Sequence, residues 1–309
     1  MNFLFGPVAS RRLGRSLGVD LVPFKTCSLD CIYCECGCTT NETIQRKEYV
    51  PFDEIIAEIK EWYSNGGKAD YITLAGSGEP TLNSRLGEII KEIKKITDIP
   101  VCILTNGTLF YCEDVREEAA LADLVIPSLD APNEEIFKKI NRPPENLNFN
   151  KYIEGLISFS KSFSGKLWLE IFIVPGINDD DKSIDELAAI ADKITLDKIQ
   201  LNTAVRPTAE KNVHSETEEK MNDLAMRFSP KAEVVASFNK KTVVNDSATK
   251  DKVFELLSRR PCTVEDIASG LGIKPADARQ FVIHLLEEDK IKKSERDGKT
   301  FWSALIKPR

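Results

Sequence analysis

The sequence has no apolar run long enough to cross a membrane and no excess of positive charge. None of its 309 residues belongs to a segment near the roughly 20 uncharged residues that a span needs. The N-terminal MNFLFGPVASRRLGRS reaches three arginines after a short apolar run. The formal net charge of −7 argues against a surface that binds nucleic acid everywhere. These absences predict a soluble, cytoplasmic protein without a membrane partner.

The sequence also lacks a secretory signal, an internal repeat and a low-complexity tract. Without secretion, eight cysteines are expected to be reduced thiols that serve metal binding or catalysis rather than disulfides. Five of them lie in the stretch TCSLDCIYCECGCTT, residues 26–40. The chain is long enough for one large domain, or for a large and a small one.

Short β-branched runs alternate with stretches of helical spacing over the first three quarters of the chain. The predicted strands are residues 18–22, 70–76, 100–106, 123–130, 166–174 and 198–205. This order predicts an α/β fold with a parallel sheet, either doubly wound or curled into a barrel. Polar motifs end five of these strands (GSGEP, TNGT, SLD, PGIND and LNT), and ligands bind at the carboxyl ends of parallel strands.

The C-terminal part is a different kind of unit. Residues 237–250 are polar and without periodicity, as in a linker. Three helical segments and a hairpin turning at Asp297 and Gly298 then predict a winged helix. The expected domains are residues 1–236, a linker over 237–248, and a winged helix over 249–309. The third helix and the wing could contact nucleic acid, a protein or peptide, or serve structure alone; their polar residues are Lys274, Asp277, Arg279, Gln280, His284, Lys292, Lys293, Arg296 and Lys299.

Three of the clustered cysteines have the spacing C-x3-C-x2-C: Cys27, Cys31 and Cys34. Three thiolates on one short loop can hold three irons of a [4Fe-4S] cluster and leave the fourth iron open to another ligand. Zinc is the alternative, with Cys36 and Cys38 completing a four-thiolate knot. A structural zinc site usually takes a second ligand pair about 12 to 20 residues on, and the next cysteine is Cys102.

These residues, with Tyr33 before the last cysteine, resemble the motif of radical S-adenosylmethionine (SAM) enzymes. The stretch from GPVASRRLGRSLGVDLVPFKTCSLDCIYCECGCTT through LAGSGEPTL, LTNGTLF, SLDAP and FIVPGIND is most similar to the wyosine-synthase-like branch. Archaeal wyosine-forming enzymes carry additional N-terminal cysteines, whereas none precedes Cys27 here. The resemblance, over roughly residues 5–205, implies a partial (β/α)6 TIM-like barrel, a [4Fe-4S] cluster and SAM.

The resemblance also implies roles for the strand-end residues. Gly76 and Gly78 would let backbone approach SAM, and Glu79 would accept its ammonium group, unless Glu79 is an ordinary surface carboxylate. Ser128 and Asp130 suit the ribose, although Asp130 could simply cap the next helix. Asn106 lies on the same rim, and Asn202 would flank the adenine.

Some residues and partners have more than one interpretation. Cys36 and Cys38 could be catalytic thiols, ligands of a second cluster with Cys102 and Cys112, or ordinary loop residues. The arginines before the cluster could form a solvated turn or an anion contact: Arg11, Arg12 and Arg15. An external one-electron donor, flavodoxin or ferredoxin, is expected because no fused flavodoxin domain is visible.

The leading hypothesis is an enzyme that cleaves SAM to a 5'-deoxyadenosyl radical and modifies an unidentified substrate, for example a macromolecule such as tRNA or a protein or peptide. A glycyl-radical-enzyme activase is the alternative within radical chemistry. A winged-helix transcription regulator that senses redox state through the cluster, and a zinc-knot binding module, are alternatives of other classes.

Overall fold

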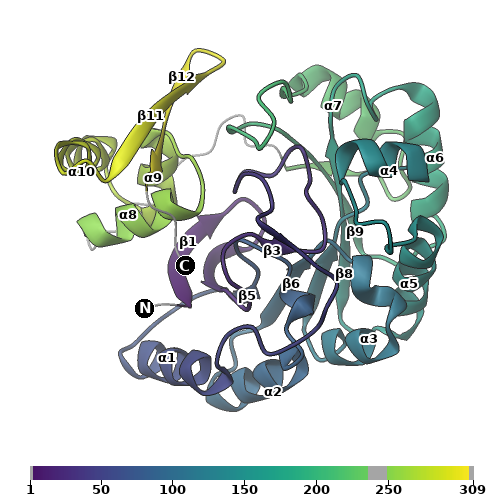
Figure 1. Ribbon diagram of the computed structural model, residues 1–309, viewed down its shortest axis with the longest axis horizontal. Coiled ribbons are helices and arrows are strands. Elements are labelled where there is room, and N and C mark those ends of the chain that lie inside the picture. The colour runs from purple at the N-terminus through teal and green to yellow at the C-terminus, as the bar shows by residue number, and fades with distance from the viewer. Residues whose placement is uncertain (1–2, 236–248, 306–309) are drawn as a thin grey trace.

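The computed structural model describes residues 3–235 and 249–305, and its largest element is one eight-stranded sheet (Figure 1). The strand order is β1-β2-β5-β6-β7-β8-β9-β10; β1 and β2 are antiparallel, and the other neighbours are parallel. The strands are β1 (Leu4–Ser10), β2 (Gly14–Val19), β5 (Tyr71–Leu74), β6 (Val101–Thr105), β7 (Leu124–Pro127), β8 (Lys166–Ile173), β9 (Lys198–Thr203) and β10 (Glu233–Val234). The predicted linker at 237–248 lies outside the described residues.

Helices connect the parallel strands and lie in an arc around the sheet (Figure 1). They are α1 (Phe52–Ser64), α2 (Leu86–Ile96), α3 (Glu113–Ala119), α4 (Glu134–Ile140), α5 (Phe149–Ser162), α6 (Asp181–Ala191) and α7 (Glu218–Ala225), with 3-10 turns η1 (Pro80–Leu82) and η2 (Thr108–Tyr111). Three of them begin at an asparagine or aspartate that caps the helix: Asn133, Asn148 and Asp180. Within the described ranges, no helix is both long and apolar enough to span a bilayer.

All six predicted strands are present, but the sheet also has edge strands that the pattern did not indicate. Strand β1 contains Gly6 and Pro7, residues that weaken a strand assignment and are tolerated at a sheet edge. The first predicted strand begins at Gly14 rather than at residue 18, because its early residues pair with β1. Strand β10 has two residues, too few to give a periodic signal.

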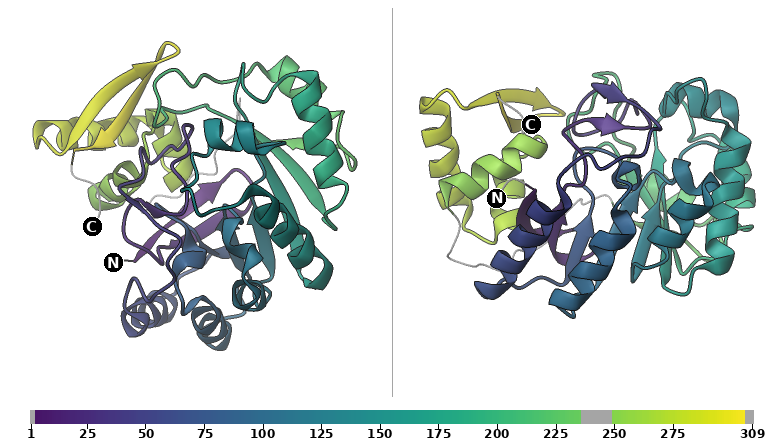
Figure 2. Two further views of the ribbon diagram at one scale, coloured as in Figure 1. Left: turned by 45° about the vertical axis from the view of Figure 1, so that its right-hand side comes forward. Right: turned by 60° about the horizontal axis from the view of Figure 1, so that its bottom comes forward.

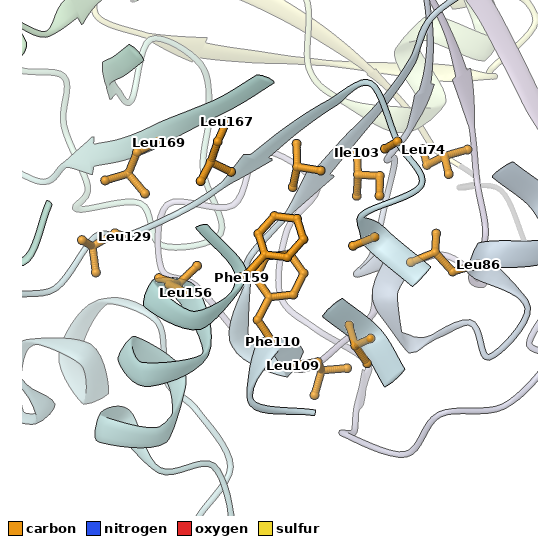
Figure 3. Close-up of a cluster of buried hydrophobic side chains, with 14 of the residues drawn as sticks. Leu74, Leu86, Ile103, Leu109, Phe110, Leu129, Leu156, Phe159, Leu167 and Leu169 are labelled. Atoms are coloured by element: carbon orange, nitrogen blue, oxygen red, sulfur yellow. The ribbon is translucent and has the colours of Figure 1, made fainter. Parts of the chain in front are cut away.

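The main core lies between the sheet and its helices. In Figure 3, Leu156 and Phe159 of α5 face Leu167 and Leu169 of β8. Phe159 also stacks on Phe110, with ring centroids 4.4 Å apart. Burying one such side chain contributes about 1.5–3 kcal/mol. The connecting helices are therefore fixed to the outer face, which leaves the carboxyl ends of the strands to carry polar loops.

Residues 249–305 form a second unit, called here the C-terminal unit, beside β1 (Figure 2). It contains α8 (Lys250–Arg259), α9 (Val264–Leu271), α10 (Pro275–Glu287) and a hairpin of β11 (Ile291–Arg296) and β12 (Lys299–Ala304). The hairpin turns where predicted, since Asp297 and Gly298 both have positive φ. Helices α8 and α9 contact β1, and Val8 packs against the unit's own apolar core.

Candidate cofactor site

The cysteine-rich loop lies at the carboxyl ends of the parallel strands. It follows β2 and is closed where the two-residue strands β3 (Thr26–Cys27) and β4 (Asn41–Glu42) pair. Backbone bonds join it to the loop after β5: the Lys25 amide donates to the Ser77 carbonyl at 2.8 Å, and the Glu79 amide donates to the Thr26 carbonyl at 3.0 Å. Figure 2 shows β3 and β4 lying beyond the end of the sheet.

The sulfur of each predicted cluster cysteine lies within hydrogen-bonding distance of one nitrogen donor. The pairs are Asn106 Nδ2 with Cys27 Sγ (3.6 Å), Asn141 Nδ2 with Cys31 Sγ (3.4 Å) and Lys25 Nζ with Cys34 Sγ (3.2 Å). The donors come from three separate segments: the end of β6, the end of α4 and the loop after β2. Thiolates that ligate a metal accept such bonds, so this donor set fits a negatively charged iron-sulfur cluster.

A single metal ion would require a tighter arrangement of side chains. Within residues 3–235 and 249–305, no three Cys, His, Asp or Glu side chains gather closely enough to hold one ion. A [4Fe-4S] cluster is larger, and each of its irons needs only one protein thiolate. The sequence spacing of Cys27, Cys31 and Cys34 is the pattern that predicts this larger group.

Both glycines of GSGEP are required by close approaches within the protein itself. Gly76 has a φ of +141°, and a Cβ there would lie 1.7 Å from Asp20 Oδ1. A Cβ on Gly78 would lie 2.1 Å from the Thr26 carbonyl oxygen, directly beside the first cluster cysteine. The motif is therefore pressed against the end of β2 and against the cysteine loop, and approach to SAM remains a prediction for both positions.

Glu79 is fully buried and joins the end of β5 to the end of β6. Its Oε1 accepts from the Thr81 amide (3.0 Å), the Thr81 hydroxyl (2.6 Å) and the Thr105 hydroxyl (2.6 Å), and its Oε2 accepts from the Asn106 amide (2.7 Å). Burial raises the pKa of Glu79, and these four donors oppose the rise. The carboxylate thus has an evident structural role, while its bond to the SAM ammonium remains a prediction.

Asp130 connects β7 to the cysteine loop and to β8. Its carboxylate accepts from the Tyr33 hydroxyl, from Asn141 Nδ2 (2.9 Å) and from the Phe172 amide (2.9 Å). The Tyr33 ring stacks on Phe172 with centroids 3.9 Å apart. Burial raises the pKa of Asp130 to about 6, although the Tyr33 and Asn141 bonds lower it. Asp130 precedes α4 but does not cap it, because Asn133 is the capping residue.

Ser128 and Asn202 also lie at this end of the sheet. The Ser128 amide donates to the Thr105 carbonyl at 3.1 Å, and its own carbonyl accepts from the Tyr152 hydroxyl. Asn202 Nδ2 donates to Glu170 Oε1 at 2.9 Å. These bonds fix both residues, and contacts with ribose and adenine remain predictions for them.

Two of the three arginines before the cysteine loop, Arg11 and Arg12, are not simply solvated, whereas Arg15 is exposed. Arg12 Nη1 forms a 2.7 Å ion pair with Glu170, and both side chains are largely buried. Arg11 Nη1 lies 3.5 Å from Asn202 Oδ1. Burial lowers the pKa of Arg11 to about 10; Glu35 opposes this effect and Arg206 adds to it. The turn after β1 therefore reaches the polar residues of β8 and β9.

Glu35 and Arg206 connect the cysteine loop to the C-terminal unit. Arg206 Nη1 lies 3.1 Å from Glu35 Oε2, and Arg206 Nη2 lies 3.2 Å from Asp266 Oδ1 of α9. Burial alone would raise the pKa of Glu35, but Arg206 and Arg11 lower it to about 2. The segment after Arg206 also bonds the loop, because the Ala209 amide donates to the Cys34 carbonyl at 3.0 Å.

A second ion pair connects the C-terminal unit to the GSGEP loop. Arg259 of α8 contacts Asp20, and its guanidinium lies 3.9 Å from the centroid of the Phe5 ring. Asp20 Oδ1 in turn accepts from the Ser77 amide at 3.3 Å. Burial raises the pKa of Asp20, and Arg259 opposes that rise. The C-terminal unit is therefore connected to the cysteine loop through Arg206 and to the GSGEP loop through Asp20.

The remaining cysteines have different surroundings. Cys36 is half-buried next to Cys34, whereas Cys38 is exposed. Cys102 is buried in an apolar cluster with Leu13, Leu124 and Ile126, as expected for a core residue. Cys112 is half-buried immediately before α3.

The predicted contact residues of the C-terminal unit mostly face outward. The exposed ones are Lys274, Arg279, Gln280, His284, Lys292, Lys293 and Lys299, while Asp277 is half-buried. Arg296, which was expected to contact a partner from the wing, is instead half-buried and points toward the body. Its guanidinium donates to the Arg206 carbonyl at 2.5 Å and to the Val213 carbonyl, and it anchors the hairpin to the loop after β9.

Comparison with known proteins agrees with this site. Residues 21–188 match the Radical SAM superfamily, a range that includes the cysteine loop and the strand ends from β5 to β8. The chain belongs to the radical SAM superfamily. Members of this superfamily are enzymes that use a [4Fe-4S] cluster and SAM. The superfamily and the two cofactors were predicted from the cysteine and strand-end motifs. The comparison confirms the superfamily and, with it, the two cofactors.

Similar proteins differ in how much of their length this radical SAM chain matches. The UPF0026 protein MJ1312 of Methanocaldococcus jannaschii is 33% identical over 316 residues, which cover 100% of this chain and 98% of that protein. The GTPase Obg of Brachyspira hyodysenteriae is 41% identical over 299 residues, but this chain spans only 44% of its length. A radical SAM methyltransferase from Sphaerobacter thermophilus shares the fold, with a TM-score of 0.54 and 17% identity over 72% of this chain and 67% of that one.

Proposed function

We propose that this chain cleaves SAM reductively at a [4Fe-4S] cluster bound by Cys27, Cys31 and Cys34, and that it modifies a macromolecular substrate, a tRNA or a protein. The observation that supports the site is that each of the three sulfurs has its own nitrogen donor. The support for a large substrate is the C-terminal unit, whose exposed basic residues lie on α10 and the hairpin.

The residues of this chain would bind and orient the cofactors. When bound, the cluster and SAM supply the chemistry, in which one electron cleaves SAM to methionine and a 5'-deoxyadenosyl radical. Asn106 and Asn141 hold two of the thiolates, and Glu79 holds the GSGEP loop against the end of β6. The stack of Tyr33 on Phe172 covers Asp130 and keeps water from that part of the site.

The proposal extends to the architecture and the partners. The body, residues 1–236, would be a partial (β/α)6 barrel of the wyosine-synthase-like branch, and residues 249–309 a winged helix that contacts the substrate. Flavodoxin or ferredoxin would deliver the electron in the cytoplasm. Cys36 is the thiol closest in sequence to the cluster ligands, so it is a better candidate for a catalytic thiol than the exposed Cys38.

Anaerobic reconstitution with iron and sulfide tests the proposal directly. With dithionite and SAM, the protein should produce 5'-deoxyadenosine, and Cys27→Ala should abolish that product. Cys112→Ala is the matched control, because Cys112 is a half-buried cysteine outside the cysteine loop and should leave the product unchanged. A well-reconstituted protein that cleaves no SAM would overturn the proposal.

Two other outcomes would identify the alternatives. Salt-dependent, sequence-selective binding to duplex DNA without SAM cleavage would indicate a regulator that senses redox state through the cluster. An electron paramagnetic resonance (EPR) signal of a glycyl radical on a partner protein would indicate an activase.

Incubation with bulk tRNA and with cytosolic protein, followed by mass spectrometry, distinguishes the two substrate classes.

A further inference from the structure

Lys25 is a buried cation whose ammonium group faces the cysteine loop. Lys25 is only 3% exposed, and its Nζ lies 3.2 Å from Cys34 Sγ. Three backbone bonds fix its position: its amide donates to Ser77, and its carbonyl accepts from the amides of Thr40 and Asn41. The side chain is therefore held at the sulfur by the same loop that carries the cluster cysteines.

A buried ammonium group is costly unless negative charge lies beside it. None of the ion pairs within residues 3–235 and 249–305 involves Lys25, and its ammonium group donates a hydrogen bond to Cys34 Sγ. Three thiolates and a [4Fe-4S] cluster would supply that negative charge. The cysteine thiolates beside Lys25, whether free or bound to a cluster, therefore offset the cost of burying its charge.

The three sulfur donors are not equivalent. Asn106 and Asn141 are neutral amides, and their nitrogens lie 3.6 Å and 3.4 Å from sulfur. Lys25 carries a full charge and lies closest, at 3.2 Å. Because charge-assisted hydrogen bonds are roughly twice as strong as neutral ones, Lys25 should have the largest influence on the cluster.

We propose that Lys25 raises the reduction potential of the cluster by placing a positive charge against the Cys34 thiolate. This inference rests on the cluster proposed above. Reduction takes one electron from an external low-potential donor and changes the cluster from the 2+ to the 1+ state. No bond forms or breaks, and no proton moves, since Lys25 stays protonated in both states. The added negative charge is stabilised by the adjacent ammonium, so the reduced state gains more than the oxidised one.

The test is a redox titration of the reconstituted full-length protein, in which the EPR signal of the reduced cluster measures the fraction reduced at each potential. Lys25→Gln should lower the equilibrium constant for reduction by about tenfold or more, which is about 59 mV for one electron. Lys25→Arg keeps the positive charge, so its equilibrium constant for reduction should stay within about threefold of the wild-type value. Lys94→Gln is the control, because Lys94 pairs with Asp123 on the surface of the body and its loss should leave the potential unchanged.

A second measurement needs no variant. Wild-type protein grown with 15N-labelled lysine side chains should show a 15N coupling to the reduced cluster in pulsed EPR, from the nitrogen beside Cys34. An equal potential in Lys25→Gln and wild type, or no lysine coupling, would overturn the role of Lys25 while the cluster itself stands. If wild-type protein assembles no cluster at all, the proposed function fails first.

Discussion

The cysteine-rich stretch has two halves that are held in different ways. In residues 26–34, each cysteine sulfur has a nitrogen donor from the body of the protein. In residues 35–38, the Glu35 side chain pairs with Arg206, which also pairs with Asp266 of the C-terminal unit. Cys38 at the far end is exposed.

The two halves are therefore held by different parts of the molecule. The first half is positioned by the strand ends, where the cofactors are expected. The second half is held by Arg206, which also pairs with Asp266 of the C-terminal unit. We therefore expect substitutions in the two halves to give different defects.

Cysteine replacement should give the largest contrast between the halves. Cys31→Ala removes a proposed iron ligand and should lower 5'-deoxyadenosine formation by at least about a hundredfold, together with the iron content. Cys38→Ala should retain both within about twofold, because Cys38 is exposed and outside the ligand set. Iron and sulfide analysis with product chromatography measures both effects. Equal losses in the two variants would show that Cys38 also binds the cluster.

Breaking the link to the C-terminal unit should give the next largest effect. Arg206→Met leaves the carboxylates of Glu35 and Asp266 without their cation, and we expect a loss of about 3 kcal/mol in unfolding free energy. Denaturant unfolding of the reconstituted protein measures it. Arg227→Met is the matched control: Arg227 also bridges two carboxylates, Asp181 and Asp185, but at the surface, so its loss should cost at most about 1 kcal/mol.

Arg259→Met should affect SAM binding rather than the cluster. Without Arg259, Asp20 loses its ion pair and holds the Ser77 amide less firmly, so the dissociation constant for SAM should rise about fivefold. Calorimetric titration of the oxidised, cluster-loaded protein with SAM measures this change. Lys198→Met breaks a surface pair with Glu233 and should leave SAM affinity as it is. An unchanged affinity in Arg259→Met would mean that α8 and the GSGEP loop are not coupled.

The smallest expected effect is a pH dependence of the same link. Burial raises the pKa of Asp266, but the opposing effect of Arg206, together with a backbone hydrogen bond from Thr263, is larger. The pKa of Asp266 in the folded protein therefore lies below the ordinary value of 3.8. The stability from this carboxylate is present above pH 3.8 and is lost as the pH falls through the lower folded pKa. Because Asp266 is partly exposed, the loss should be at most about 1 kcal/mol. The comparison of wild type with Asp266→Asn from pH 6 to pH 3 isolates it.

Sequence patterns were sufficient where a signal is local. Six strands, their connecting helices and the hairpin turn at Asp297 and Gly298 follow from periodicity and turn chemistry over a few residues each. Strand β1 was missed because Gly6 and Pro7 weaken its pattern and its partner β2 supplies the pairing. Arg296 was named as a possible contact residue although it anchors the hairpin, because an exposed and an anchored arginine look the same in sequence.

The sequence predicted which residues lie at the site but not the contacts that they make. Glu79 and Asp130 were expected to face SAM, and the structure shows that both carboxylates already accept several protein donors. Lys25 and Arg206 were not recognised at all. A lysine two positions before the first cluster cysteine was the available signal for Lys25, but no local pattern marks Arg206.

The sequence by itself determined the chemistry: three cysteines at fixed spacing on a loop, and polar motifs at the ends of parallel strands. Tertiary structure decided which groups surround those cysteines. Arg206 lies 171 positions from Glu35 and 60 from Asp266, and Arg259 lies 239 positions from Asp20. A ligand motif is local because one short loop must surround one cluster, whereas the charges near it are brought together only when the sheet forms and the C-terminal unit packs on β1.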